Sequence, residues 1–187
     1  MERRLFLTGL LGVAGTAGIA AMLPRQALAA ADVAQIERDA IAALAKLYDT
    51  TPAAKVLGDK AKAILVFPSI LKAGLIIGGQ GGNGALFVDG KVVGFYNTAA
   101  ASYGLQAGAQ EFAYAMFMMT DAAIEYIKNA DGWEVGVGPS LVLVDEGVAK
   151  SLTTTTAKDD VYAFIFGQKG LMAGIGIQGS KITKINP

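Results

Sequence analysis

The first periodic stretch of the chain is helical. Between residues 32 and 48, apolar side chains recur every three or four positions, the spacing that places them on one face of a helix. The opposite face carries acidic as well as basic side chains, so we expect this helix to pack on the protein core; insertion into an anionic membrane is the alternative. Thr51 and Pro52 predict a short second helix that ends near Gly58, with Thr51 as its N-cap.

After Lys62 the pattern changes to short apolar and β-branched runs separated by glycines, which is typical of antiparallel sheet. Asp89 and Gly90 predict a hairpin turn, and Thr120 and Asp121 predict the start of a helix over residues 120–128. The expected strands are residues 63–67, 74–78, 84–89, 91–97, 102–110, 111–119, 133–144 and 161–184. The predicted fold class is α+β, mainly antiparallel and sandwich- or barrel-like, with an N-terminal amphipathic helix and one mid-chain helix.

Composition excludes many functions. The 187 residues contain no Cys and no His, so thiol nucleophiles, Cys/His zinc sites and His-dependent triads cannot be built. Lys plus Arg and Asp plus Glu number 16 each, so no overall positive charge favours nucleic acid as a partner. We therefore expect no cofactor and no catalysis. A metal-dependent phosphoester hydrolase that uses Asp159 or Asp160 is the least favoured alternative.

The N-terminus has the pattern of an export signal. Residues 1–29 begin with Arg3 and Arg4, continue through a Gly-, Ala- and Leu-rich run, and end in a small-x-small cleavage motif. The paired arginines favour twin-arginine export with cleavage after Ala29; the general secretory route and a retained anchor are the alternatives. We thus expect one domain over residues 30–187 in the periplasm or another exported location, peripheral to a membrane.

Lysines are unevenly distributed. Two basic stretches, residues 46–72 and 161–187, flank an acidic middle. If the fold brings these stretches together, their lysines form one positive patch; separately solvated lysines are the simpler alternative. The candidate residues for binding an anionic head group are Lys60, Lys62, Lys72, Lys169, Lys181 and Lys184.

A glycine-rich segment resembles a phosphate-binding loop. Gly79, Gly81, Gly82 and Gly84 fit a G-x-G-x-x-G string, but an apolar run and a turn follow where a nucleotide site needs a helix. We expect this segment to be a tight connection between strands. The alternative is that its successive backbone N–H groups form a nest that binds an anion. Likewise, Ser69 and Lys72 fit an S-x-x-K motif, but Pro68 predicts a turn between strands there, with Lys72 as a surface cation.

Several ordered segments form a recognisable series. They are AKAILVFP (61–68), KAGLIIGG (72–79), ASYGLQAGAQ (101–110), GVGP (136–139) and GQKGLMAG (167–174). In this order they resemble the SYLF domain family, and the resemblance spans about residues 33–187. It implies lipid binding, because eukaryotic members engage phosphoinositide membranes through basic residues and an N-terminal amphipathic segment. Fungal members also bind actin, a partner that the export signal makes unexpected here.

These observations lead to one functional expectation. We expect a non-catalytic periplasmic protein that binds anionic phospholipid head groups, with Lys62, Lys72 and Lys169 in the segments that match the family. The alternative is an envelope scaffold that binds another protein through an apolar face of the sheet and has no lipid ligand.

Overall fold

One curved sheet organises the chain in the computed structural model, which describes residues 25–74, 77–103, 108–129, 132–145, 148–149, 157–170, 177 and 179–186. The helices are α1 (Arg25–Thr50), α2 (Pro52–Gly58) and α3 (Asp121–Asn129). The strands are β1 (Ala63–Gly74), β2 (Ile77–Val88), β3 (Lys91–Tyr103), β4 (Gly108–Met118), β5 (Trp133–Glu134), β6 (Leu141–Leu143), β7 (Val161–Gly170) and β8 (Lys181–Ile185). The predicted α+β class is confirmed.

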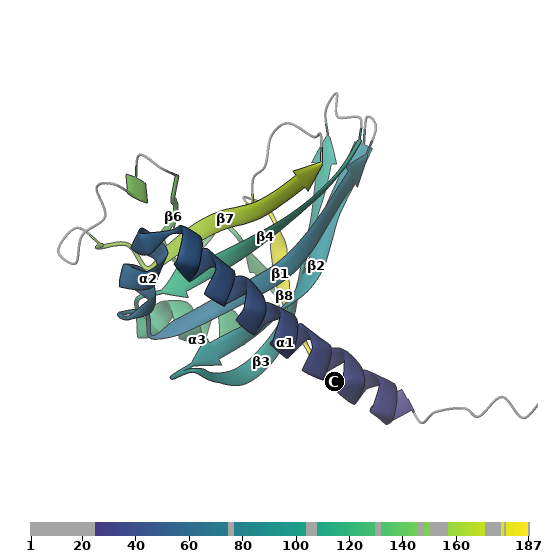
Figure 1. Cartoon of the computed structure of the whole chain (residues 1–187), viewed down its shortest axis with the longest axis horizontal. Helices are drawn as coiled ribbons and strands as arrows, with labels where there is room; N and C mark the ends of the chain where they lie inside the picture. Colours follow the sequence, from purple (N-terminus) through teal and green to yellow (C-terminus); the bar gives the residue numbers. More distant parts are fainter. Residues whose placement is uncertain are drawn as a thin grey trace, which may run out of the picture.

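Neighbouring strands follow the order β5-β8-β3-β2-β1-β4-β7-β6 in this eight-stranded sheet. The β6–β7 pair is parallel, and the other pairs are antiparallel. The sheet curls into a half-barrel, with α1 and α2 lying across one of its faces (Figure 1). We call that face the outer face and the opposite one the inner face.

The outer face is covered by the first two helices. Ala40 and Leu47 on α1 and Leu57 on α2 are fully buried and join a cluster with Phe117 and Phe164 of the sheet. The apolar residues that recur every three or four positions therefore form the face of α1 that packs against the sheet. This confirms the prediction that the helix packs on the core.

The inner face holds a second aromatic cluster, which includes the tryptophan. Tyr96, Phe112, Tyr114 and Trp133 are buried there together with Ile124 of α3. The Trp133 indole N–H donates a hydrogen bond to the Val137 carbonyl at 2.9 Å, so its polar atom has a partner inside the core. The ends of α3 are also as predicted, because the Ala123 amide donates to the Thr120 hydroxyl at the helix start.

Two predicted breaks in the first hairpin are wrong. β1 runs on through Pro68 to Gly74, and its register shifts beside Pro68, as expected for a proline accommodated at a bulge. The predicted strand 74–78 instead spans the reversal between β1 and β2, where Gly74 lies opposite Gly78. A Cβ on Gly74 would lie 2.4 Å from the Gly78 Cα, so the close approach of the two strands at this position requires glycine.

Later boundaries also differ from the prediction. Residues 102–110 are the end of β3 and the start of β4, with 104–107 outside the described residues. The strand predicted over 133–144 is interrupted between β5 and β6, where Gly136 and Gly138 adopt positive φ angles of 103° and 92°. The strand predicted over 161–184 is divided into β7 and β8. Thr51 precedes α2 as expected but makes no side-chain capping hydrogen bond.

Of the predicted export signal, residues 1–29, only the last five residues lie in the described part of the chain, in α1. This helix begins at Arg25 and so includes Ala29, the residue after which we predicted cleavage, while Arg3 and Arg4 lie outside the described residues. Export and cleavage remain predictions. Within the described part of the chain, no helix combines the length and apolar character needed to cross a bilayer.

Candidate functional site

The two ends of β1 define two regions of the sheet. At the hairpin end, β1 meets β2, Gly74 lies opposite Gly108 of β4, and Gln110 lies opposite Gly170 of β7. At the helix-covered end, β1 begins beneath α1 and α2. Ten residues of extended chain separate Lys62 from Lys72, or about 33 Å. Cations at opposite ends of β1 cannot contact one head group.

Lys60 and Lys62 lie at the helix-covered end, and both are exposed. Lys62 precedes β1, and its backbone N–H donates to the Met118 carbonyl at 2.9 Å. Its ammonium group forms an ion pair with the Asp121 carboxylate at the start of α3. An exposed pair of this kind contributes between zero and about 1 kcal/mol to stability, and it neutralises part of the charge that Lys62 would offer a ligand.

Lys72 and Lys169 lie at the hairpin end but on opposite faces. Lys72 is 4% exposed on the inner face, so the prediction of a surface cation is wrong. It follows buried Ile70 by two positions, and in a strand this spacing returns the side chain to the same face. Lys169 is exposed on the outer face, opposite Glu111, whose carboxylate also accepts a hydrogen bond from the Ser69 hydroxyl at 2.8 Å.

Lys181 and Lys184 are exposed on β8. Lys181 lies opposite Glu134 of β5, and its aliphatic chain covers Gly132. Lys184 lies opposite Tyr96 of β3. The structure thus distributes the predicted lysines over both ends and both faces of the sheet, and it does not unite them in one patch.

The glycine segment is part of the sheet, and the predicted loop is wrong. Gly79, Gly81, Gly82 and Gly84 lie within β2 and pair with residues of β3, so their N–H groups belong to ladders and form no nest. None of the four has a positive φ angle. A Cβ on Gly82 would lie 2.2 Å from the Ser69 carbonyl oxygen, and one on Gly84 would lie 2.4 Å from that of Val66. These two glycines permit close backbone packing.

The S-x-x-K pair cannot act as a nucleophile and base. Ser69 is exposed and bonded to Glu111 on the outer face, whereas Lys72 is buried on the inner face. Because residues three apart in a strand point to opposite sides, the motif separates the two groups here.

A buried polar cluster on the inner face was missed. Thr98, Gln110 and Ser180 are each at most 5% exposed and lie near Lys72 at the hairpin end, and Gln80 donates to the Ser180 hydroxyl at 3.2 Å. For the buried side-chain oxygen of Gln110 and the buried Tyr114 hydroxyl, no hydrogen bond of good geometry is found within the described part of the chain. Burial raises the pKa of Tyr114, and the nearby Thr98 side chain counters part of that rise. Gln80 and Gln110 are the cross-strand neighbours of Lys72. This pairing can be recognised only once the strand register is known.

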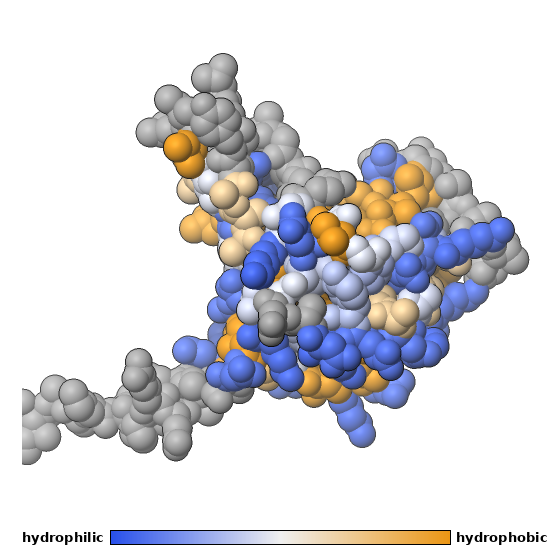
Figure 2. All heavy atoms as spheres, turned by 180° about the vertical axis from the view of Figure 1, so that it is seen from behind, coloured by the Kyte–Doolittle hydropathy of each residue, from blue (hydrophilic) through white to orange (hydrophobic). Residues whose placement is uncertain are grey.

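The outer face of the hairpin end carries uncovered apolar side chains. Leu71 is 60% exposed and Ile77 is 73% exposed, and small exposed residues, Ala73, Ala101 and Ala109, surround them on neighbouring strands. Figure 2 views the molecule from the side opposite α1, and from that side too hydrophobic residues lie where the hairpin end projects at the upper left, beside the grey residues. Leu71 and Ile77 were visible in the sequence as apolar residues, but their exposure was not.

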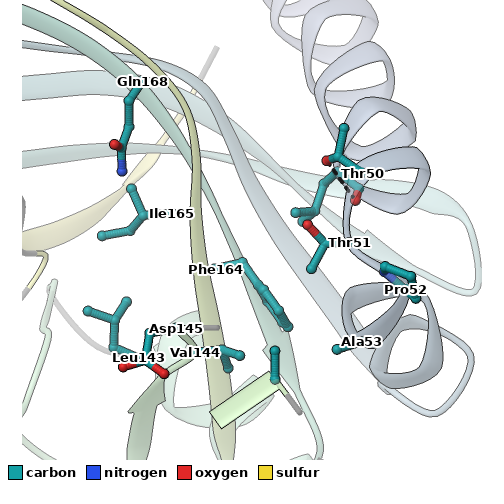
Figure 3. Close-up of a pocket in the computed structure, with 12 residues that line it drawn as sticks. Thr50, Thr51, Pro52, Ala53, Leu143, Val144, Asp145, Phe164, Ile165 and Gln168 are labelled. Carbon is teal, nitrogen blue, oxygen red and sulfur yellow. Dashed lines mark hydrogen bonds between the residues drawn. The ribbon is translucent and has the colours of Figure 1, made fainter. Parts of the chain in front are cut away.

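A pocket of about 740 Å³ lies where α1 meets α2, beside β6 and β7. Figure 3 shows Phe164 and Ile165 of β7 on one side and Thr51 and Ala53 on the other. The walls are mostly apolar, and Asp145 and Gln168 are among the polar groups on the lining. Its volume is in the range of small-molecule sites, but its lining contains none of the predicted lysines.

The acidic residues considered for metal binding have structural partners. The Asp160 carboxylate accepts hydrogen bonds from the Ser140 amide at 3.0 Å, the Ser140 hydroxyl at 2.9 Å and the Thr120 hydroxyl at 2.9 Å. These bonds, led by the Ser140 amide, lower the pKa of Asp160. Asp159 accepts from the Tyr162 hydroxyl at 3.2 Å. Among the described residues, no group of three or more potential metal ligands is found.

Comparison with known proteins gives one family. The family model described as "Ysc84: Las17-binding protein actin regulator" matches residues 99–186, from within β3 to the end of the described chain. No curated protein matches the sequence. The resemblance to the SYLF domain is confirmed over this range, which contains Lys169, Lys181 and Lys184.

Proposed function

We propose that the protein binds anionic phospholipid head groups without catalysing a reaction. The match of residues 99–186 to the Ysc84 family model, which describes a family of binding domains, is the observation that carries the proposal. It favours a binding role, and the lipid-binding character of SYLF domains supplies the class of ligand.

Exposed lysines support the electrostatic part of the proposal. Lys169, Lys181 and Lys184 are exposed and lie within the matched range. Glu111 and Glu134 lie opposite the first two, but the ion pairs found among the described residues do not include any of the three lysines. Each lysine near an anionic surface contributes on the order of 1 kcal/mol, and salt screens the attraction. Lys72 is removed from this set because it is buried, and Lys62 ranks below the others because Asp121 neutralises it.

The proposed location is the periplasm or another exported compartment, at a membrane surface. The pattern of residues 1–29 supports export. The family description names actin regulation through Las17 binding. We do not propose either partner for this chain, because an exported protein does not meet them.

The test is co-sedimentation of the full chain with vesicles of phosphatidylcholine that contain graded amounts of phosphatidylglycerol, at low and high salt. The triple variant Lys169→Gln, Lys181→Gln, Lys184→Gln is compared with a charge-matched control, Lys91→Gln, Lys128→Gln, Lys158→Gln, which also removes three exposed lysines. We expect binding to rise with anionic lipid, to fall with salt and to weaken more in the first variant.

Two results would contradict the proposal. A wild-type protein that stays in the supernatant with every vesicle has no affinity for these lipids, and the envelope-scaffold alternative would then be pursued with protein partners. Binding that ignores salt and all six lysines would exclude head-group recognition by these cations. A variant with Arg3→Gln and Arg4→Gln measures any contribution of the N-terminal arginines separately.

A further inference from the structure

The hairpin end exposes aliphatic side chains that folding alone does not require. Leu71 and Ile77 are large apolar residues with exposures of 60% and 73%, and they lie on adjacent strands of the same outer face. Elsewhere on that face, α1 and α2 bury the apolar residues, and Val66 and Ala85 are fully buried. Apolar surface left uncovered beside a covered area of the same sheet indicates an interaction surface.

The composition of this surface distinguishes a bilayer from a protein partner. Apart from Glu111 with its partner Ser69, the described side chains around Leu71 and Ile77 are aliphatic or small, and none is an aromatic or arginine anchor of the kind that dominates protein interfaces. Two projecting aliphatic residues are too few for the roughly 800 Å² that each side of a stable protein interface buries. They suffice to enter the acyl boundary of a membrane, where each buried methylene contributes about 0.8 kcal/mol.

The charges around the surface are compatible with the same partner. Lys169 is exposed on β7, at the margin of the surface around Leu71 and Ile77. When the aliphatic residues enter the acyl layer, a cation at this margin lies at the level of the lipid phosphates. Glu111 lies between Leu71 and Lys169 in the register, and the Ser69 hydroxyl donates to its carboxylate. The helix-covered end carries Asp59, Asp89, Asp121, Asp159 and Asp160, which an anionic surface repels and which offset the attraction of Lys60 and Lys62 there.

We propose that the outer face of the hairpin end, centred on Leu71 and Ile77, is the surface that enters the bilayer, with Lys169 at the phosphate level. This inference rests on the proposed lipid binding and adds to it the part of the fold that makes the contact. It places α1 on the protein core, so the first helix is not the inserted element.

The absence of cysteine permits a site-specific test. In the full chain, Ile77→Cys carries a single thiol for an environment-sensitive fluorophore, and Val93→Cys provides the control. Val93 is 47% exposed and lies near the start of β3, toward the helix-covered end. On adding vesicles that contain phosphatidylglycerol, we expect a blue-shifted, brighter emission from position 77 and little change from position 93.

Substitution provides the second measurement. The double variant Leu71→Ser, Ile77→Ser should bind vesicles about tenfold more weakly, because two aliphatic groups no longer leave water. The control variant Val93→Ser, Val137→Ser removes two apolar residues with 47% and 54% exposure and should bind as the wild type does.

The outcomes separate this inference from the proposed function. If the wild type co-sediments with vesicles while position 77 stays in a water-like environment, or positions 77 and 93 respond equally, the hairpin end is not the contact surface and lipid binding stands. Unchanged affinity in the Leu71/Ile77 variant overturns the inference in the same way. If the wild type does not bind at all, both fall together.

Discussion

Val66 and Leu71 lie on the same strand and the same face of the sheet, yet their surroundings are opposite. Val66 is fully buried beneath the first helices, and Leu71 is 60% exposed beyond their reach. Both residues are aliphatic, so hydropathy does not distinguish them. Their exposure differs because the helices cover the sheet over Val66 and do not extend over Leu71. The helix-covered end is held by packing and by polar contacts such as those of Asp160, whereas the hairpin end buries polar side chains on its inner face and exposes Leu71 on its outer face.

The largest difference concerns tolerance of added volume along β2. Gly84→Ala should destabilise the protein by about 1–3 kcal/mol, because its Cβ would meet the Val66 carbonyl oxygen at 2.4 Å. Gly79→Ala, nearer the hairpin end, should cost less than half as much, since the nearest atom would be 3.6 Å away. Urea unfolding of both variants checks this. Equal losses would show that close packing extends to the hairpin end.

A smaller loss is expected on removing the Asp160 charge. Asp160→Asn weakens the hydrogen bonds from Ser140 and Thr120 and should lower Tm by roughly 2–4 °C near neutral pH. Because the pKa of Asp160 is lowered in the folded state, its stabilisation is present above the ordinary pKa of 3.8 and lost as pH falls through the lower folded value. The Tm difference should therefore shrink below about pH 4. A difference independent of pH would exclude the carboxylate as its source.

Two buried tyrosines should respond differently to loss of their hydroxyls. The Tyr162 hydroxyl donates to Asp159 and accepts from the Asp159 amide at 3.1 Å, so Tyr162→Phe should cost about 0.5–1.5 kcal/mol. Among the described residues the Tyr114 hydroxyl has no hydrogen bond of good geometry, although Thr98 lies beside it, and Tyr114→Phe should be neutral or slightly stabilising. Denaturant midpoints of the pair measure this. A large loss at Tyr114 would show that Thr98 or a bound water is a genuine partner.

The smallest effect on stability belongs to the hairpin end itself. Leu71→Ser with Ile77→Ser should leave Tm within about 1 °C of the wild type, because both side chains are largely in water already. The same variant is expected to lose vesicle affinity, so stability and binding separate at this surface. A marked fall in Tm would mean that these residues support the fold.

Local patterns in the sequence predicted the helices better than the strand boundaries. The spacing of residues 32–48, Pro52 and the Thr120 cap each reflect contacts within one helical turn, and those helices are present. The length of β1 depends on a bulge that accommodates Pro68 between two partner strands, and the division after Gly170 depends on long-range pairing. Such non-local contacts leave little trace in a single sequence.

The candidate site was predictable in kind and less so in position. Residues 167–174 and their neighbours carry a family resemblance that holds over residues 99–186. The placement of Lys72 failed because strand parity, set by the register, turns it inward beside Gln80 and Gln110. The glycines of β2 were read as a loop because a string of glycines does not reveal whether it serves a turn or close packing.

The pairing of β3 with β8 affects how the chain can be made. The stretch Phe95–Ala99 in the middle of β3 pairs with β8, a segment that comes much later in the sequence. While a ribosome synthesises the residues between them, that stretch of edge has no β8 partner. An unpaired strand edge is a template for intermolecular pairing. We therefore expect completion of β8 to reduce aggregation of the nascent protein, and a truncation that removes residues 181–185 to leave this stretch open.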